Sequence, residues 1–478
     1  MISPNVLSVL RTIVGSENYL DSEADKTLYS YDGTPMLRQK PDAILIPRSP
    51  EIISKILRLA NEEGFAVVPR GSGSGLSGGS VPVPNSVVLL FPPMNKILSI
   101  DEVNLTAKVE AGVITARLQN EVESRGLFYP PDPGSASIST IGGNVAENAG
   151  GLRGLKYGVT KNYVLALDVI LPNGELVTLG SESVKDVQGL NLRDIFIGSE
   201  GTLGIFTNIT LRLLPKPEHA VVMMIHFDSI AAIGEFVAEV MLARLTPAML
   251  EFLDRNTIRA VEDYAKLGLP TDLAALVLVE LDGYKVVVED EVQTVFAIAK
   301  KLGARYIKAA ETAEEALKLK LARKAAFSAL ARLKPTTILE DASVPRAKLP
   351  DMLLQIESFA QQESVLVGNF GHLGDGNLHP TCLINERDSD EVHRSERFFE
   401  RTFETAVKFG GAITGEHGTG LAKKKYLEMA TGKTQVELMR KFKEAIDPNN
   451  ILNPSKMFDA NSLFRSKCER NLSRAVKT

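Results

Sequence analysis

The sequence predicts an α+β protein with more than one domain, and three observations support this prediction. The chain has 478 residues, which is more than one compact hydrophobic core usually contains. A strand–helix–strand pattern occupies residues 42–79. A second alternation of apolar strands and helices extends over roughly residues 216–420. We therefore expect a first domain over residues 1–215, a second over 216–420, and a helix-rich C-terminal segment over 421–478.

The strand–helix–strand pattern is defined by its helix ends. The apolar strand AILIP (43–47) precedes Ser49, an expected N-cap, and Pro50, which favours the first turn of a helix. Gly64 is expected to end this helix, and FAVVP (65–69) follows as the second strand. The pattern predicts a β-α-β unit.

Further apolar segments predict the remaining elements. In the first domain the expected strands are VVLLF (87–91), TAKVEAG (106–112), VLALDVILPNGELVTLG (164–180) and the strand within GSEGTLGIFTNITLRLLP (198–215). In the second domain the expected strands are VVMMIHF (221–227), AMLEFLD (248–254) and AALVLVELDG (274–283). The expected helices between them are IAAIGEFVAEVMLARL (230–245) and VVEDEVQTVFAIAKKLG (287–303).

Charge and cysteine content exclude several functional classes. A net charge of −5 argues against a nucleic-acid-binding surface, which is usually basic. Two cysteines, Cys382 and Cys468, are too few for a disulfide framework or an iron–sulfur site, so a reducing, cytoplasmic location is expected. No run of about 20 apolar residues predicts a membrane span, although peripheral association with the inner face of the membrane stays open.

Two glycine-rich segments suggest a phosphorylated cofactor. Residues 69–82, PRGSGSGLSGGSVP, contain the spacing G-x-G-x-x-G, but no helix is expected after it and no Lys-Ser/Thr follows. This excludes both a Rossmann fingerprint and a Walker A loop. Glycine-rich loops nevertheless let successive backbone N–H groups converge on an anion. A second such segment spans 130–158, and two of them favour a large phosphorylated cofactor over plain surface turns.

The segment GHLGDGNLHP (371–380) contains a candidate metal site. Asp375-Gly376 predicts a two-residue type I′ hairpin turn, which places His372 directly opposite His379. Both imidazoles would then reach one metal ion. The alternative is that each is an ordinary core histidine. A second polar stretch, GGAITGEHGTG (410–420), offers neighbouring Glu416 and His417, whose side chains point opposite ways on an extended backbone.

Seven motifs in order carry a resemblance to a known family. They are PRGSGSGLSGG, PDPGSAS with IGGNVAENAGG, LKYG, GSEGTLGI, the histidine stretch, GEHGTG and DPNNILNP. Together they resemble the FAD-linked D-2-hydroxyacid dehydrogenases of the vanillyl-alcohol-oxidase (PCMH-type) superfamily, with the strongest similarity to glycolate oxidase FAD-binding subunits and FAD-dependent D-lactate dehydrogenases. The resemblance covers about residues 20–458.

The resemblance implies a PCMH-type FAD-binding domain of two α+β subdomains, followed by a cap domain with an antiparallel sheet flanked by helices. The C-terminal segment should return to the FAD domain. Matching positions imply contacts to FAD from Arg70, Gly71, Ser72, Gly73, Ser74, Gly75, Ser77, Pro131, Asp132, Gly142, Gly143, Asn144, Gly150, Gly151, Tyr157, Gly201, Ile205, Asn377 and Asn453. No histidine or cysteine occurs in residues 69–82 or 130–158, so FAD is expected to be non-covalent.

The resemblance also implies the reacting groups. His372, His379 and Glu416 are the expected metal ligands, with Zn, Mn or Fe as the divalent metal, and His417 is the expected catalytic base. Arg323, in LARKAAFSALARLKP (321–335), is expected to bind the substrate carboxylate as a bidentate fork. Arg332 is a second substrate candidate, and for both arginines the alternative is a solvated helix face. Asn377 is expected to contact flavin or substrate.

The implied reaction is the oxidation of a short D-2-hydroxy acid, glycolate or D-lactate, to the 2-oxo acid. Because the chain shows no second redox site, electrons must pass to a partner: an iron–sulfur subunit, an electron-transfer flavoprotein, a quinone or a cytochrome. A homodimer stays open. The alternatives are a D-2-hydroxyglutarate dehydrogenase or an oxidase of the same superfamily, a non-catalytic flavin-binding subunit, and a metal-binding module without flavin. A dicarboxylate would need a further cation, and Leu339 does not provide one.

Overall fold

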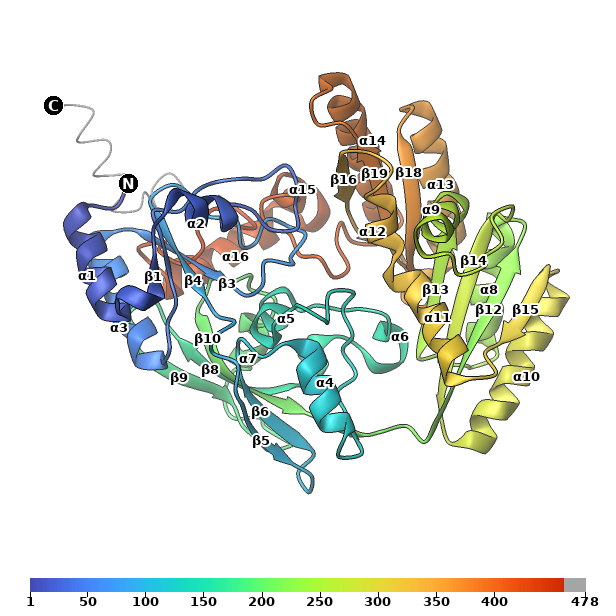
Figure 1. Ribbon diagram of the computed structural model, residues 1–478, viewed down its shortest axis with the longest axis horizontal. Helices are drawn as coiled ribbons and strands as arrows, with labels where there is room; N and C mark the ends of the chain where they lie inside the picture. Colours follow the sequence, from blue (N-terminus) through green and yellow to red (C-terminus); the bar gives the residue numbers. More distant parts are fainter. Residues whose placement is uncertain (460–478) are drawn as a thin grey trace. The chain divides into compact units, whose positions relative to one another are not determined.

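The structure is a computed structural model that describes residues 1–459, so Cys468 lies outside the described residues. The chain forms two compact units. Among the described residues, the first contains 1–149, 160–215 and 417–459, and the second contains 150–159 and 216–416. Figure 1 shows the elements of both units in their sequence colours.

The first unit contains a four-stranded sheet built on the predicted β-α-β pattern. Its order is β1-β2-β4-β3, formed by β1 (Tyr19–Leu20), β2 (Ala43–Leu45), β4 (Ser86–Leu90) and β3 (Ala66–Arg70). Both β2 and β3 run parallel to β4, so β4 lies between the two strands that helix α3 (Pro50–Glu63) connects. Gly64 ends α3 in the left-handed conformation, as predicted. Ser49 precedes the helix, but its side chain makes no capping hydrogen bond.

A second sheet of the first unit is antiparallel throughout. Its order is β5-β6-β10-β8-β9, from β5 (Ile97–Asp101), β6 (Thr106–Glu110), β10 (Ile205–Arg212), β8 (Val164–Ile170) and β9 (Leu176–Gly180). The short strands β7 (Leu127–Phe128) and β11 (Leu214–Pro215) pair with each other. The helices of this unit are α1 (Pro4–Val14), α2 (Glu23–Leu28), α3, α4 (Thr115–Glu123), α5 (Ile141–Glu147), α7 (Leu192–Phe196), α15 (Lys424–Thr431) and α16 (Lys433–Ile446), with single 3-10 turns at 16–18 and 160–162.

The C-terminal segment packs against the first sheet of the same unit. After α16, the N–H of Val67 donates to the carbonyl of Ile451 (2.7 Å), and the N–H of Asn453 donates to the carbonyl of Val67 (2.9 Å). Residues 451–453 therefore run beside β3. Asn453 is buried, and its side-chain amide donates to the carbonyls of Gly79 and Glu200.

The second unit is a sheet of eight strands with helices on both faces. Its order is β15-β12-β14-β13-β18-β19-β16, with β17 also pairing with β19, and every pair is antiparallel. The strands are β12 (His219–Phe227), β13 (Met249–Asp254), β14 (Ala275–Gly283), β15 (Tyr306–Ala309), β16 (Thr336–Leu339), β17 (Ala342–Ser343), β18 (Leu366–His372) and β19 (Asn377–Ile384). The strands and helices predicted for 216–303 are confirmed.

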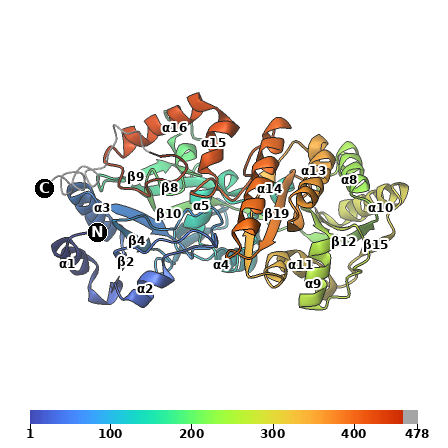
Figure 2. The ribbon, with the colours of Figure 1, turned by 90° about the horizontal axis from the view of Figure 1, so that it is seen from above.

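Two groups of helices cover this sheet (Figure 2). On one side lie α8 (Ile230–Leu242), α10 (Lys285–Lys301), α13 (Leu349–Gln362) and α14 (Ser389–Lys408). On the other lie α9 (Arg255–Ala265), α11 (Ala313–Lys324) and α12 (Ala326–Leu330). A 3-10 turn at residues 346–348 contacts α8 and α13. Because both faces are covered, the central strand β14 is buried along nearly its whole length. Within the described residues, no helix is both long and apolar enough to cross a membrane.

Residues 150–159, which carry the short helix α6 (Gly154–Tyr157), pack in the second unit. The ammonium of Lys156 lies 2.5 Å from Asp282 Oδ1, and the hydroxyl of Tyr157 donates to Asp282 Oδ2 at 2.8 Å. Gly374 approaches Leu155 so closely that a Cβ on the glycine would lie 2.5 Å from a leucine methyl carbon. This stretch of the second glycine-rich segment is therefore fixed to the β14 strand and the β18–β19 loop.

Candidate active site

The β18–β19 hairpin has a different register from the predicted one. His372 pairs with Asn377, and Phe370 pairs with His379, so the predicted direct pairing of the two histidines is wrong. The loop has four residues, and the N–H of Gly376 donates to the carbonyl of His372 at 3.1 Å. Gly376 has φ +78°, whereas Asp375 does not have positive φ, so the type I′ turn is absent.

Neighbouring segments explain this loop. The guanidinium of Arg346 donates to the carbonyl of Gly374 at 2.5 Å, and Gly376 packs against the carbonyl of Val344. Both contacts come from the connection after β17, which a two-residue turn rule does not consider. The hairpin register is thus set by tertiary contacts as well as by the Asp-Gly dipeptide.

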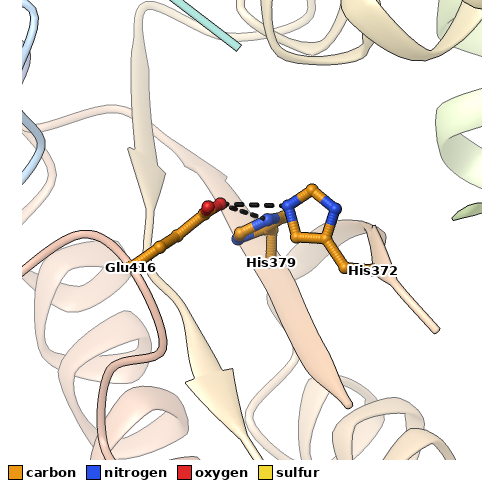
Figure 3. A group of neighbouring side chains, drawn as sticks. All are labelled: His372, His379 and Glu416. Carbon is orange, nitrogen blue, oxygen red and sulfur yellow. Dashed lines mark hydrogen bonds and ion pairs between the residues drawn. The ribbon is translucent and has the colours of Figure 1, made fainter. Parts of the chain in front are cut away.

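The change in register keeps the two histidines on one face of the sheet. Relative to the prediction, the pairing shifts by two residues, and side chains two residues apart in a strand point the same way. His372 and His379 therefore lie diagonally across the hairpin, with ring centroids 4.9 Å apart. Figure 3 shows both rings converging on the carboxylate of Glu416.

His372, His379 and Glu416 form a compact group of ligand atoms. Glu416 Oε1 lies 3.0 Å from His372 Nε2 and 3.2 Å from His379 Nε2. One ligand atom from each residue lies within 4.8 Å of the others, and both histidines are buried. Two imidazole nitrogens and one carboxylate oxygen are a donor set suited to a divalent transition metal, so these residues fit the metal that the sequence predicts.

The Glu416 backbone is held by a residue that the sequence analysis did not identify. Asp341, fully buried after β16, accepts hydrogen bonds from the N–H of Gly415 (2.6 Å) and of Glu416 (2.8 Å). Its other oxygen accepts from the hydroxyl of Thr414 at 2.8 Å. A Cβ on Gly150 would lie 2.6 Å from Glu416 Oε2, so only a glycine leaves room for this carboxylate.

Glu251 is a second unpredicted residue of the group. Its Oε1 lies 2.6 Å from His372 Nδ1, and its Oε2 accepts from Arg323 Nε at 2.6 Å. Arg323 is buried on α11 with its guanidinium 4.7 Å above the ring of Phe370, so a solvated helix face is the wrong interpretation for this residue. Arg332 is exposed and lies 5.4 Å above the ring of Tyr264 instead.

Two pKa shifts reflect the charge at this group. Burial opposes protonation of His372, but the carboxylates of Glu251 and Glu416 outweigh it and raise the pKa of the imidazole well above its usual value. Burial also opposes ionisation of Glu416, yet His372 and His379 lower the pKa of its carboxyl well below the usual range. The site therefore places an imidazole and two carboxylates close together in a buried position.

Asn377, an expected flavin or substrate contact, lies next to this group. It is buried and pairs with His372 across the hairpin, and no described residue donates a hydrogen bond to its Oδ1. A Cβ on Gly415 would lie 2.6 Å from the Asn377 amide carbon, so the glycine permits close packing there. An unsatisfied buried amide oxygen beside two imidazoles indicates space for a ligand donor.

The first glycine loop, in the first unit, has the features of an anion-binding loop. Gly73 has φ +72° and Gly78 has φ +77°, which favour glycine. Among residues 1–459, the backbone amides of Ser72, Gly73, Ser74 and Gly75 donate no hydrogen bond to another protein group. Arg70 is buried beneath the loop and donates to the carbonyl of Tyr31 at 2.7 Å. Free amides over a buried guanidinium fit a pyrophosphate.

The other predicted flavin contacts lie at several places. In the first unit, Gly142 and Gly143 begin α5, where a Cβ on Gly142 would lie 2.7 Å from that of Ala111. Also in this unit are Gly71, Ser77, Pro131, Asp132, Asn144, Gly201, Ile205 and Asn453. Gly150, Gly151, Tyr157 and Asn377 lie in the second unit. His417, the predicted base, is the first residue of the segment that returns to the first unit.

Family models match most of the described chain. The C-terminal domain of FAD linked oxidases matches residues 216–457, and an FAD binding domain matches residues 41–180. The first match covers residues 216–416 of the second unit and most of the returning segment, and the second covers both sheets of the first unit in part together with residues 150–159.

Several curated proteins are similar along their full length. The glycolate oxidase subunit GlcD of Bacillus subtilis is 49% identical over 98% of this chain and 100% of its own. A D-lactate dehydrogenase of Anaerostipes hadrus is 35% identical over 94% of each chain. A D-2-hydroxyglutarate dehydrogenase of Stutzerimonas stutzeri is 32% identical over 96% of this chain and 100% of its own.

Among solved structures, p-cresol methylhydroxylase with substrate bound superimposes with a TM-score of 0.80. The two chains are 18% identical, and the match covers 95% of this chain and 96% of the other. This likeness and the two family models together confirm the predicted fold class, an α+β protein with a PCMH-type FAD-binding domain and a second domain.

Proposed function

Because the chain belongs to the FAD linked oxidases, and is therefore an FAD-dependent oxidoreductase, we propose that it oxidises a short D-2-hydroxy acid to the 2-oxo acid. Glycolate and D-lactate are the proposed substrates, since relatives of high similarity are named for them. The observation that carries the proposal is the convergence of His372, His379 and Glu416 beside the buried Arg323. These are a metal-ligand set and a carboxylate-binding cation.

The proposed roles follow from the chemistry of each side chain. His372, His379 and Glu416 would hold a divalent metal, Zn, Mn or Fe, and the first glycine loop would hold non-covalent FAD. When bound, FAD accepts a hydride at N5 and the metal supplies Lewis acidity. Arg323 orients the substrate through its carboxylate. His417 removes the hydroxyl proton as general base, so that the α-hydrogen leaves with its electron pair.

Substitution of the proposed base tests the mechanism. The variant His417→Ala should bind FAD with the spectrum of the wild type and should not be reduced by D-lactate under anaerobic conditions. Stopped-flow measurement of flavin absorbance checks this. Reduction at the wild-type rate would show that His417 is not the base.

An electron-accepting partner is part of the proposal. The Bacillus subtilis relative is named a subunit, and within residues 1–459 His372, His379 and Glu416 are the one group of side chains found that could hold a metal ion. We propose an iron–sulfur subunit, an electron-transfer flavoprotein, a quinone or a cytochrome as acceptor. Assays of glycolate, both lactate enantiomers and D-2-hydroxyglutarate with an artificial dye would identify the substrate, and peroxide formation in air would indicate an oxidase instead.

D-2-hydroxyglutarate is the second candidate substrate. A relative 32% identical to this chain is named for it. A second carboxylate would need a further cation beside Arg323. Leu339, at the end of β16, is buried and apolar, and it favours the monocarboxylates. Turnover of D-2-hydroxyglutarate faster than that of glycolate and D-lactate would reverse this preference.

A further inference from the structure

Glu251 is an acidic residue with apolar neighbours on both sides in strand β13, whose other acidic residue, Asp254, ends the strand. It occupies the middle of β13, MLEFLD, and its side chain is 1% exposed. A buried carboxylate is costly unless both of its oxygens have hydrogen-bonding or charged partners. The position therefore needs a structural or functional reason.

Each oxygen of Glu251 has a different partner. Oε1 receives Nδ1 of His372 and Oε2 receives Nε of Arg323, both at 2.6 Å. The first contact is built into the sheet, because Glu251 and His372 are directly opposed in the β13–β18 pair. The second comes from α11, the helix that covers this face. One carboxylate thus joins a proposed metal ligand to the proposed substrate-binding arginine.

This bridge has two chemical consequences. When a metal replaces the proton on Nε2, donation from Nδ1–H to Glu251 would hold the tautomer of His372 whose Nε2 lone pair is directed at the metal, on the side where Glu416 lies. An imidazole that donates to a carboxylate is also a more basic ligand. Donation from Nε fixes the plane of the Arg323 guanidinium while the two terminal nitrogens stay available for a substrate carboxylate.

We propose that Glu251 is a positioning residue that sets both the metal-binding tautomer of His372 and the orientation of Arg323. This inference rests on the proposed function, because it takes His372 as a metal ligand. It assigns to β13 a role in the site, and it explains why the apolar pattern of that strand is interrupted by a carboxylate.

Metal affinity of the FAD-loaded protein tests the proposal without using catalysis. After removal of metal by a chelator, wild type and E251Q are titrated with Zn²⁺ and with Mn²⁺ against a competing dye. A glutamine amide has only one acceptor oxygen. It can accept from His372 or from Arg323, and its NH₂ group then faces the N–H donor of the other residue. We expect E251Q to bind both ions about 10–100-fold more weakly than wild type.

A matched control separates this effect from the general loss of a buried ion pair. Glu280, on β14 of the same sheet, is also buried and pairs with the ammonium of Lys320 at 2.7 Å. E280Q also removes a buried carboxylate that is paired with a cation. Glu280, however, is bonded to Lys320 and not to a proposed metal ligand. Its metal affinity should equal that of wild type within about threefold.

The KM for D-lactate at saturating metal is the second readout. We expect E251Q to raise KM even when the metal site is filled, since Arg323 is no longer held, whereas E280Q should not. If E251Q does not fold, E251D serves the same test, because it keeps the charge but withdraws the oxygens by one methylene and should also weaken metal binding.

The outcomes are distinguishable. Wild-type metal affinity in a folded E251Q or E251D overturns the role of Glu251 and leaves the proposed function intact. Equal losses in E251Q and E280Q also overturn it, because the effect would then be one of general stability. A wild-type protein that binds neither Zn²⁺ nor Mn²⁺ overturns the metal-assisted proposed function itself, and with it this inference.

Discussion

The groups proposed to bind ligands in the two units are of different kinds. The glycine loop of the first unit, residues 70–78, presents backbone amides over a buried arginine. The sheet face of the second unit presents side chains instead. These are Glu251 from β13, His372 from β18, His379 from β19 and Arg323 from α11. The loop depends on the absence of side chains, whereas the sheet face depends on which way side chains point.

This difference determines how each region responds to mutation. A Cβ added to a glycine of the loop would obstruct the proposed FAD site. Removing a histidine side chain from the sheet face would delete a proposed metal ligand. Each kind of substitution should affect only its own ligand. The following predictions test that separation, from the largest expected effect to the smallest.

His379→Ala should have the largest effect. It removes one of three proposed metal ligands, and we expect kcat/KM with D-lactate to fall by at least about 100-fold. Elemental analysis should show loss of metal, while the visible spectrum should still show a full complement of FAD. His393→Ala, an exposed histidine of α14, is the control and should keep both ligands. Full metal occupancy in His379→Ala would contradict the ligand assignment.

Gly73→Val should weaken FAD binding and leave the metal in place. Gly73 has φ +72°, and a Cβ there would lie 2.1 Å from a terminal nitrogen of Arg70. A β-branched residue at positive φ is strained, so we expect FAD affinity to fall at least about 30-fold with metal content unchanged. Gly126→Val is the matched control, because Gly126 lies in the same unit outside the proposed FAD contacts, has φ +73°, and a Cβ there has no atom within 4 Å. Gel filtration followed by the flavin-to-protein absorbance ratio measures both; joint loss of metal and FAD would break the separation.

Gly376→Ala should destabilise the hairpin that aligns the histidines. It combines φ +78° with a Cβ only 2.1 Å from the carbonyl oxygen of Val344, and we expect a loss of about 2 kcal/mol in the free energy of unfolding. Gly410→Ala has φ +79° but no atom within 4 Å, so it isolates the backbone strain. Urea denaturation would measure both, and equal losses would mean that the Val344 contact is unimportant.

The smallest effect concerns His226, a buried histidine on the same sheet whose Nε2 has no hydrogen-bond partner among the described residues. Burial, together with the charge of Arg305, lowers the pKa of His226 to about 4, opposite in direction to His372. The folded state therefore binds fewer protons than the unfolded state between pH 4 and 6.5. Stability should be full above pH 6.5 and fall by about 1–2 kcal/mol as pH decreases through 4. In His226→Phe this part of the pH dependence should disappear from thermal melts; its persistence would assign it to another group.

Much of the fold could be predicted because it depends on local signals. Gly64 ends α3 as its sequence indicates, and the apolar strands of residues 216–303 are confirmed. The motifs predicted the family, since they record backbone requirements that are local in sequence. The position of β4 between β2 and β3 was not predicted, because strand order depends on contacts distant in sequence.

The candidate site was predicted less completely. The histidines were identified through a turn rule that gave the wrong register, and they remain together only because the shift is two residues. Glu251 and Asp341 were missed, although Glu251 interrupts an apolar strand and could have been noticed as a buried charge. Asp341 follows β16, and its partners Thr414 and Glu416 are more than 70 residues away, so no local pattern reveals them.

The placement of residues 150–159 in the second unit affects how the protein can be divided. The chain enters and leaves that unit twice, so residues 216–416 alone are not a complete folding unit. A fragment with those boundaries would leave Asp282 buried without Lys156 and Tyr157, and Gly374 without Leu155. Any truncated version intended to isolate the unit that carries the proposed metal site must therefore include the decapeptide Gly150–Val159, supplied in trans or joined by circular permutation.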